Sequence, residues 1–381
     1  MRCYRMRSRS AQAGLVAGLL VVWTGTIGCD SQNNPILGLL GGGGLPVVAA
    51  TIDTQELGDE WTSALQIPLP ADGAIQVNGA IDGADDVDVF DLGPVEAGDR
   101  IILQTEQGGG LDAAAGLFDD EGMLLIVNDD RSYSMRLYDP YIDHIVREDL
   151  PRCYVAIASS PYQPSTGSYA LTIERQPDRS VPQPQGQAVL FDFNGEPGVR
   201  IGYRQPLDVP AFDATDISSS YAGQTDEMID LIEAMVMDDY ADYDVDFYST
   251  ADGDNPTGDV TRIFFGSYDA GLLGLADTVD PYNTRPEEEC IVFIETFELF
   301  MPLNPTVEEM ATALANVAAH ELGHLLGLNH TRDVTEVMDI SASALQMLSD
   351  ETFHVAPLDD GVFPIGLQDP GMLLMQALGA R

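Results

Sequence analysis

The chain has 381 residues, of which 45% are hydrophobic and 8% aromatic, enough to build packed cores. Its 62 acidic residues outnumber 17 basic ones, and the formal net charge is −45. A field of this sign repels polyanions, which excludes nucleic acid and anionic lipid headgroups as ligands. The length predicts two domains together with a targeting segment.

Residues 1–28 have the pattern of a secretory signal. Four arginines precede an apolar stretch from Ala13 to Val22, which is too short and wrongly flanked for a membrane-spanning helix. The end of this segment resembles a bacterial lipobox, which implies that Cys29 is lipidated. The alternative is ordinary cleavage without a lipid. We therefore expect an exported protein, either a cell-envelope lipoprotein whose membrane contact is a lipid anchor, or a secreted one.

Residues 29–50 contain a glycine-rich run and are predicted to form a flexible tether. From residue 51 to residue 176, short apolar runs alternate with turn-forming Gly, Asp and Pro. This spacing predicts an all-β sandwich. The predicted strands include 86–92, 100–105, 123–128, 153–159 and 168–174.

The order of these runs resembles the bacterial pre-peptidase C-terminal domain, a β-sandwich attached to secreted proteases. The matching stretches are Gly83–Phe90, Ala97–Ile101, Gly110–Asp112, Leu117–Asp119, Asn128–Asp130 and Tyr154–Ile157. In that family the sandwich usually follows the catalytic domain, whereas here it would precede one.

Residues 177–187 contain three prolines and are predicted to be an extended linker. Beyond it, strand and helix patterns alternate, which predicts an α+β domain over residues 188–381. Strands are expected at 188–193, 245–248, 260–265 and 290–297, with helices over 226–239 and from Thr306 onward. Thr306 and Glu309 have the spacing of a capping box.

The second of these helices carries the residues most typical of a chemical site. His320 and His324 lie four residues apart, so both rings project from one helix face and can bind one metal ion. Gly327 is predicted to end the helix in a left-handed turn, which allows His330 to return as a third ligand. Three imidazoles leave one tetrahedral position open, as in a catalytic zinc site.

The string from His320 to His330 resembles the metzincin metallopeptidases, and its spacing is that of the matrixins. The resemblance implies that His320, His324 and His330 bind zinc, that Glu321 is the general base, and that Met338 forms the turn beneath the metal. Residues 271–277 look like the family's cleft-edge strand, which could pair with an extended peptide. Thr331 and the absence of a tyrosine after Met338 depart from the better-known subfamilies.

The predicted function is therefore a zinc-dependent endopeptidase in which Glu321 works through a metal-activated water on a protein or peptide substrate. The alternative is a surface adhesion or binding lipoprotein with an inactive protease fold. Calcium is a second candidate cofactor, because hard cations bind clustered oxygens. The candidates with side-chain oxygens are Asp85, Asp86, Asp88, Asn128, Asp129, Asp130, Asp252 and Asp254.

If Cys29 is lipidated, two cysteines remain, Cys153 and Cys290, and their pairing is left open because they fall in different predicted domains. Cys153 follows Pro151 and Arg152, which superficially resembles the cysteine that keeps matrixins latent. It also opens an apolar run, which favours a buried structural cysteine instead. His144 and His354 lie outside the motif and are assigned no role.

Overall fold

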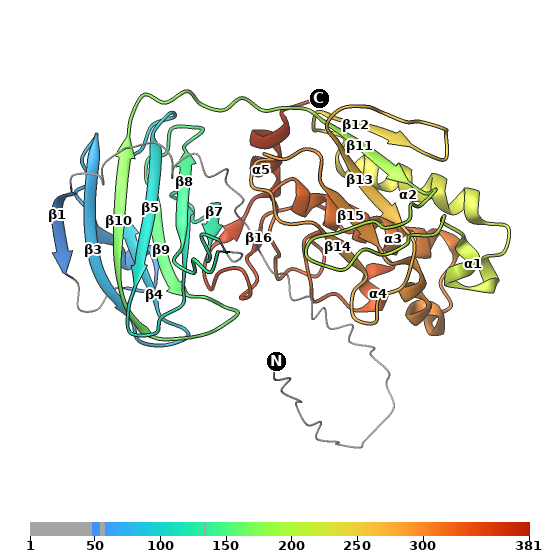
Figure 1. Cartoon of the computed structure of the whole chain (residues 1–381), viewed down its shortest axis with the longest axis horizontal. Helices are drawn as coiled ribbons and strands as arrows, with labels where there is room; N and C mark the ends of the chain where they lie inside the picture. Colours follow the sequence, from blue (N-terminus) through green and yellow to red (C-terminus); the bar gives the residue numbers. More distant parts are fainter. Residues whose placement is uncertain (1–47, 54–57, 133–134) are drawn as a thin grey trace, which may run out of the picture.

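The computed structural model describes residues 48–53, 58–132 and 135–381, which form two domains lying side by side (Figure 1). The signal peptide predicted for residues 1–28, Cys29 and most of the predicted tether lie outside this range. In the part of the chain that is described, no helix combines the length and apolar character needed to cross a bilayer.

The first domain is a sandwich of two five-stranded sheets. One sheet has the order β1-β3-β10-β5-β8 and contains β1 (Val48–Asp53), β3 (Gly73–Ile81), β5 (Arg100–Gln107), β8 (Tyr141–Ile145) and β10 (Gly167–Gln176). The other has the order β2-β4-β9-β6-β7 and contains β2 (Leu65–Gln66), β4 (Val87–Asp91), β6 (Ala113–Phe118), β7 (Leu124–Asn128) and β9 (Tyr154–Ser159).

Alternating side chains of these strands fill the space between the two sheets. Ile101 and Leu103 of β5 pack with Leu171 and Ile173 of β10 in one buried apolar cluster. This is the period-two burial expected of strands with one face toward a core. The predicted all-β sandwich is confirmed.

The second domain is built on a mixed sheet of order β12-β11-β13-β15-β14. Its parallel strands are β11 (Gln187–Asp192), β12 (Val245–Ser249), β13 (Val260–Phe265) and β15 (Glu289–Val292), and β14 (Gly274–Ala276) runs antiparallel at one edge. Helices α2 (Thr225–Asp239) and α3 (Val307–Leu325) share one core with the sheet strands. An α+β domain therefore follows the sandwich, as predicted.

Helix α3 begins where the sequence predicted. Thr306 is its N-cap, and the Glu309 backbone N–H donates to the Thr306 hydroxyl over 3.2 Å. The Thr306 N–H donates in return to the Glu309 carboxylate over 2.7 Å, which completes the capping box. Every residue from Met310 to Leu325 is buried, so α3 is the central helix of the domain.

The strand predicted over 290–297 is too long. The extended segment stops at Val292, and residues Ile294–Leu303 form a 3-10 helix. Ile294, Phe297 and Phe300 are all fully buried, at the three-residue spacing that aligns side chains along a 3-10 helix. A short apolar run fits either structure, and packing decides between them.

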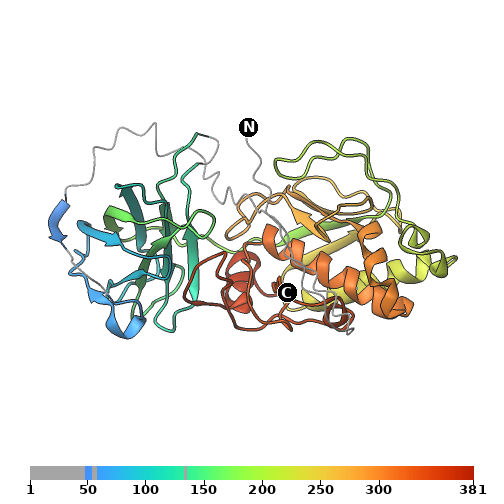
Figure 2. The same ribbon diagram turned by 90° about the horizontal axis from the view of Figure 1, so that it is seen from below.

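The last part of the chain lies between the two domains (Figures 1 and 2). Phe363 is fully buried and packs against Phe118 of the sandwich, with ring centroids 5.5 Å apart. The Leu367 N–H donates to the Gly122 carbonyl over 3.0 Å. The elements of this region are β16 (Ala356–Pro357), β17 (Leu367–Gln368) and α5 (Pro370–Leu378). Helix α4 (Ala344–Met347) packs in the core of the second domain instead (Figure 1). The remaining short helices are α1 (Ala214–Ile217) and two 3-10 turns, Trp61–Ser63 and Ser219–Tyr221.

The proline-rich segment between the sandwich and β11 runs along both domains. The Arg179 N–H donates to Gly98 of the sandwich over 2.8 Å, and the Gln185 N–H donates to Ala377 of α5 over 2.9 Å. The segment is extended, but it joins domains that touch each other directly. Cys153 and Cys290 are buried, free thiols in the cores of separate domains.

Candidate metal centre

Two of the three predicted ligands are oriented by backbone carbonyls. The Nδ1 atom of His320 lies 2.8 Å from the Val337 carbonyl, and the Nδ1 atom of His324 lies 2.8 Å from the Leu328 carbonyl. A carbonyl only accepts, so each Nδ1 carries the hydrogen. Each Nε2 is then left with the lone pair that a metal ion requires.

The turn after the helix depends on a glycine. Gly327 has φ +100°, and a Cβ atom there would lie 2.8 Å from the Tyr282 backbone nitrogen. Only glycine accommodates both the dihedral angle and the close approach. The chain reverses at this point and brings His330 back to the end of α3.

The three imidazoles converge on one point. Their ligand atoms all lie within 4.8 Å of one another, and the Nε2 atoms of His324 and His330 are 3.0 Å apart. Two nitrogens bound to one tetrahedral zinc ion at about 2.0–2.1 Å would lie about 3.3 Å apart. The donor set therefore fits a zinc ion with three histidine ligands.

Burial keeps these rings neutral. Desolvation lowers the pKa of His320 to about 3 and that of His324 to about 4, and it lowers the pKa of His330 well below its usual value. A neutral imidazole is the form that binds a metal ion. The site can thus accept a cation without first losing protons near neutral pH.

Glu321 lies on the side of α3 that faces the sheet edge. Its side chain is only 2% exposed, and burial raises its pKa well above the usual value. The backbone of Ala276, in edge strand β14, hydrogen-bonds to the carboxylate. Glu321 therefore stands between the metal-binding helix and the strand that borders the site.

Met338 lies directly under the same helix. It is fully buried, and a Cβ atom added at Gly323 would lie 2.6 Å from the Met338 sulfur. The glycine between the two helical histidines thus leaves room for the methionine. The preceding residue, Val337, supplies the carbonyl that orients His320.

Residues 215–360 match the family model of the matrixins, a range that contains the three histidines, Glu321 and Met338. The second domain is metzincin-like. No curated protein matches the chain.

Several solved structures are similar to parts of the chain. Archaemetzincin from Methanopyrus kandleri shares 18% identity over 44% of this chain and 87% of its own, with a TM-score of 0.26. The pre-peptidase C-terminal domain of collagenase from Bacillus anthracis shares 12% identity over 32% of this chain and 94% of its own, with a TM-score of 0.21. PliG from Aeromonas hydrophila, a periplasmic inhibitor of g-type lysozyme, shares 12% identity over 33% of this chain and 99% of its own, with a TM-score of 0.24. At these TM-scores none of the likenesses bears on function.

The third ligand of the metzincin-like domain is held by residues far along the chain. Gln368 is fully buried and bonds twice to the backbone of Asn329, accepting from its N–H and donating to its carbonyl, each over 2.7 Å. The Asp359 N–H donates to the His330 carbonyl over 3.0 Å. The sequence motif gave no indication of either residue, because their contact with the loop is set by the tertiary fold.

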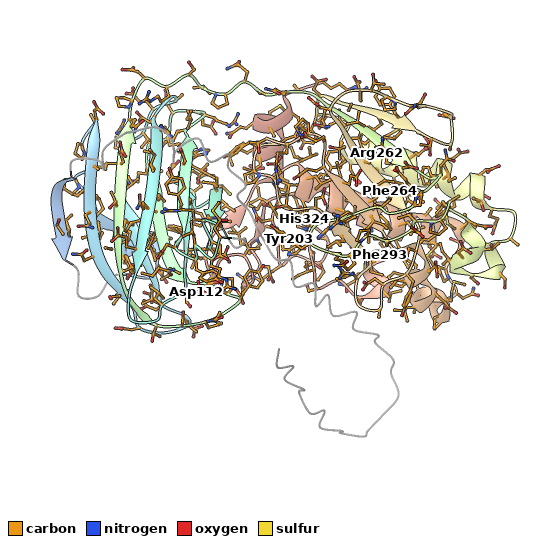
Figure 3. The ribbon with its side chains drawn as sticks, in the orientation of Figure 1. Asp112, Tyr203, Arg262, Phe264, Phe293 and His324 are labelled. Atoms are coloured by element: carbon orange, nitrogen blue, oxygen red, sulfur yellow. The ribbon has the colours of Figure 1, made fainter. Side chains whose placement is uncertain are left out.

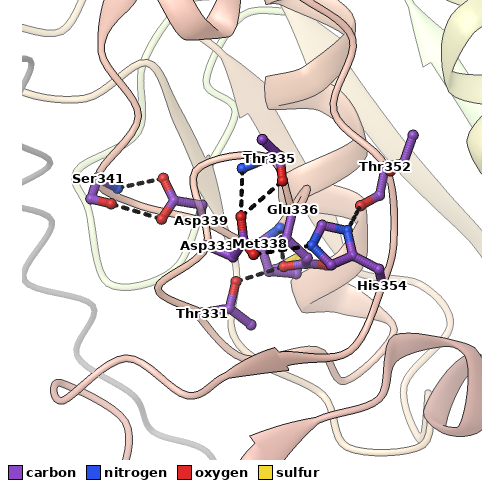
Figure 4. Close-up of polar contacts among 9 residues, drawn as sticks. All are labelled: Thr331, Asp333, Thr335, Glu336, Met338, Asp339, Ser341, Thr352 and His354. Atoms are coloured by element: carbon purple, nitrogen blue, oxygen red, sulfur yellow. Dashed lines mark hydrogen bonds and ion pairs between the residues drawn. The ribbon is translucent and has the colours of Figure 1, made fainter.

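A buried carboxylate ties this ligand loop to the methionine turn (Figure 4). Glu336 is fully buried and accepts from the Thr331 hydroxyl over 2.6 Å and from the Met338 N–H over 2.8 Å. Desolvation raises its pKa to about 7. Thr331, which departs from the better-known subfamilies, therefore has a structural role beside His330.

The other predicted candidates add no ligand to the triad, although Asn128 and Asp129 line a cavity shared with His324 and His330. Among residues 48–53, 58–132 and 135–381, the histidine triad is the one group of three or more His, Cys, Asp or Glu close enough to hold a metal ion. The acidic residues suggested for calcium do not form such a group. Burial raises the pKa of the Cys153 thiol, and this residue lies in the sandwich core. His144 packs on Tyr282 at 5.3 Å between ring centroids, and His354 lies 3.4 Å from Asp333.

Proposed function

We propose that this protein is an exported zinc-dependent endopeptidase. The observation that carries the proposal is the convergence of three neutral imidazoles, together with a buried carboxylate on the same helix that is not among the ligands. A structural zinc site would use a fourth protein ligand, whereas three ligands leave a position for water. The matrixin family match over the same residues supports the same activity.

His320, His324 and His330 would hold the ion through Nε2 of the two helical rings and a ring nitrogen of His330. Zinc, when bound, acts as a Lewis acid and lowers the pKa of bound water toward neutrality. A divalent cation nearby also favours the ionised form of Glu321 over the protonated form that burial favours. Glu321 accepts a proton from the attacking water and donates it to the departing amine.

The substrate in this proposal is an extended peptide. Strand β14 is the edge of the sheet, and an extended peptide can be bound by addition to such an edge. The hydrogen bond from Ala276 to Glu321 links this strand to the proposed base. A peptide added along β14 would bring its backbone past the carboxylate.

The test compares two glutamates of the same helix. The variant Glu321→Gln should retain about one zinc per chain and lose casein cleavage by about 100- to 10,000-fold, the usual contribution of a general base. Glu308→Gln, an exposed control in the first turn of α3, should behave as the wild type. Zinc content is measured by atomic absorption and cleavage by release of soluble peptides.

Full cleavage by the zinc-loaded Glu321→Gln variant would contradict the assigned role. A wild-type protein that binds no zinc and cleaves no peptide would instead favour the adhesion alternative. Chelation of the metal should abolish cleavage and re-addition of zinc should restore it.

A further inference from the structure

The cavity beside the metal centre is formed by both domains. It has a volume of about 40 Å³, and His324 and His330 form part of its wall. The sandwich contributes the segment from Val127 to Asp129 and the pair Pro161 and Tyr162. Part of the surface around the site is therefore supplied by the sandwich and not by the metzincin-like domain.

The sandwich is held firmly in this position. The Tyr282 hydroxyl, from the metzincin-like domain, donates to the Leu125 carbonyl of β7 over 2.8 Å. The Arg147 guanidinium lies 4.2 Å from the centre of the Tyr282 ring and donates to the Gln376 carbonyl over 3.0 Å. The apolar cluster that contains Phe118 and Tyr154 of the sandwich also contains Leu358 and Phe363. A hydrophobic interface limits the motion of one domain against another.

The two sandwich segments at the cavity are also tied to each other. Ser160 hydrogen-bonds through its side chain to the Asp129 carboxylate, and its N–H donates to the Asp112 carbonyl over 2.7 Å. The Gln163 N–H donates to the Ser160 carbonyl, which closes a turn with Pro161 and Tyr162 in its central positions. Proline at the first central position restricts such a turn.

We infer that the β-sandwich forms a fixed wall of the substrate cleft and that Tyr162 selects peptides with a small side chain next to the scissile bond. This inference rests on the proposed peptidase function and names the substrate class for it. Its basis is the position of the Pro161–Tyr162 turn on a cavity shared with His324 and His330.

The size of the cavity sets the limit on the side chain. A water molecule needs about 10–15 Å³ of such volume, so this cavity holds about three waters. A methyl group fits within that space and a phenyl ring does not. The wall includes the apolar residues Val127, Val279 and Val362 together with Asp129, so the lining limits the size of the side chain and not its charge.

The experiment measures binding to the zinc-loaded full chain by calorimetry. The probes are two dipeptide hydroxamates that differ only in carrying a methyl or a benzyl side chain. The methyl compound should bind the wild type at least about tenfold more tightly. The variant Tyr162→Ala should bring the two affinities within a factor of about three, because it widens the wall. Tyr138→Ala, an exposed sandwich tyrosine that does not line the cavity, should keep the wild-type ratio.

Equal affinities for the two probes in the wild type would overturn the inference, as would an unchanged ratio in Tyr162→Ala. A variant that binds both probes more tightly by the same factor would also overturn it, since the sandwich would then obstruct the cleft without selecting. Failure of both probes to bind has the same consequence. Casein cleavage is measured on the same preparation. If casein is cleaved, the peptidase proposal stands even when the probes overturn the inference about Tyr162. If casein is not cleaved, the peptidase proposal itself has failed.

Discussion

The two halves of the metal centre are built in different ways. His320, Glu321 and His324 lie within five residues of one buried helix, and their mutual positions follow from helical geometry. His330 lies on a loop, and contacts from Gln368, Asp359 and the Thr331–Glu336 pair fix its backbone. The helical half depends on local spacing, whereas the loop half depends on residues up to 39 positions away.

Substitutions should disturb the loop half of the metal centre more easily than the helical half. Helix α3 is capped, buried from Met310 to Leu325 and packed against both the sheet and α2, so its two ligands move little. The loop carries its ligand through hydrogen bonds that can be removed one at a time. Loss of a supporting bond there should weaken metal binding without unfolding the helix.

The largest loss of zinc affinity is expected from replacing His324, the helical ligand that contacts the loop ligand His330. The Nε2 atom of His324 contacts His330, and the bond between its Nδ1 atom and the Leu328 carbonyl orients the ring. His324→Ala should reduce zinc affinity by more than about 100-fold, beyond the range for residues that only support ligands. Competition with a fluorescent chelator measures the affinity. His354→Ala, a histidine outside the triad, is the matched control and should retain zinc; comparable zinc loss in both variants would contradict the assignment of His324.

A smaller loss of zinc affinity is expected from removing a residue that supports the loop half. Gln368→Ala removes both bonds to Asn329, and such supporting residues contribute about 10- to 100-fold in metal affinity. The far-UV circular dichroism of the variant should match the wild type, because α3 is untouched. Gln183→Ala, an exposed linker glutamine, serves as the control. An unchanged zinc affinity in Gln368→Ala would show that the loop holds His330 without this residue.

The same division explains what the sequence alone could predict. The capping box at Thr306, the histidine spacing and the turn at Gly327 are local patterns, and the structure has each of them where the sequence indicated. Gln368 and the Pro161–Tyr162 turn reach the centre only through tertiary packing, so no spacing rule could identify them. The error at residues 294–297 has a related cause, because their buried apolar side chains fit a strand and a 3-10 helix equally well.

The smallest expected effect is a pH dependence in the loop half. Burial raises the pKa of Glu336 to about 7, above its usual value of 4.5. Between these values the native state binds a proton that the unfolded chain has released, so stability is lost as the pH rises from about 5 to 8. The replacement Glu336→Gln preserves an acceptor for Thr331 and Met338 but cannot ionise.

The free energy of unfolding of Glu336→Gln should therefore be close to that of the wild type at pH 5. By pH 8 it should exceed the wild-type value by on the order of 1 kcal/mol. Urea titrations of the metal-free proteins at both pH values measure this difference, with exposed Glu308→Gln as the control. A difference that stays constant with pH would mean that Glu336 does not change protonation over this range. A difference that grows would show that the ligand loop is joined to the methionine turn by a carboxylate that ionises only at a cost in stability.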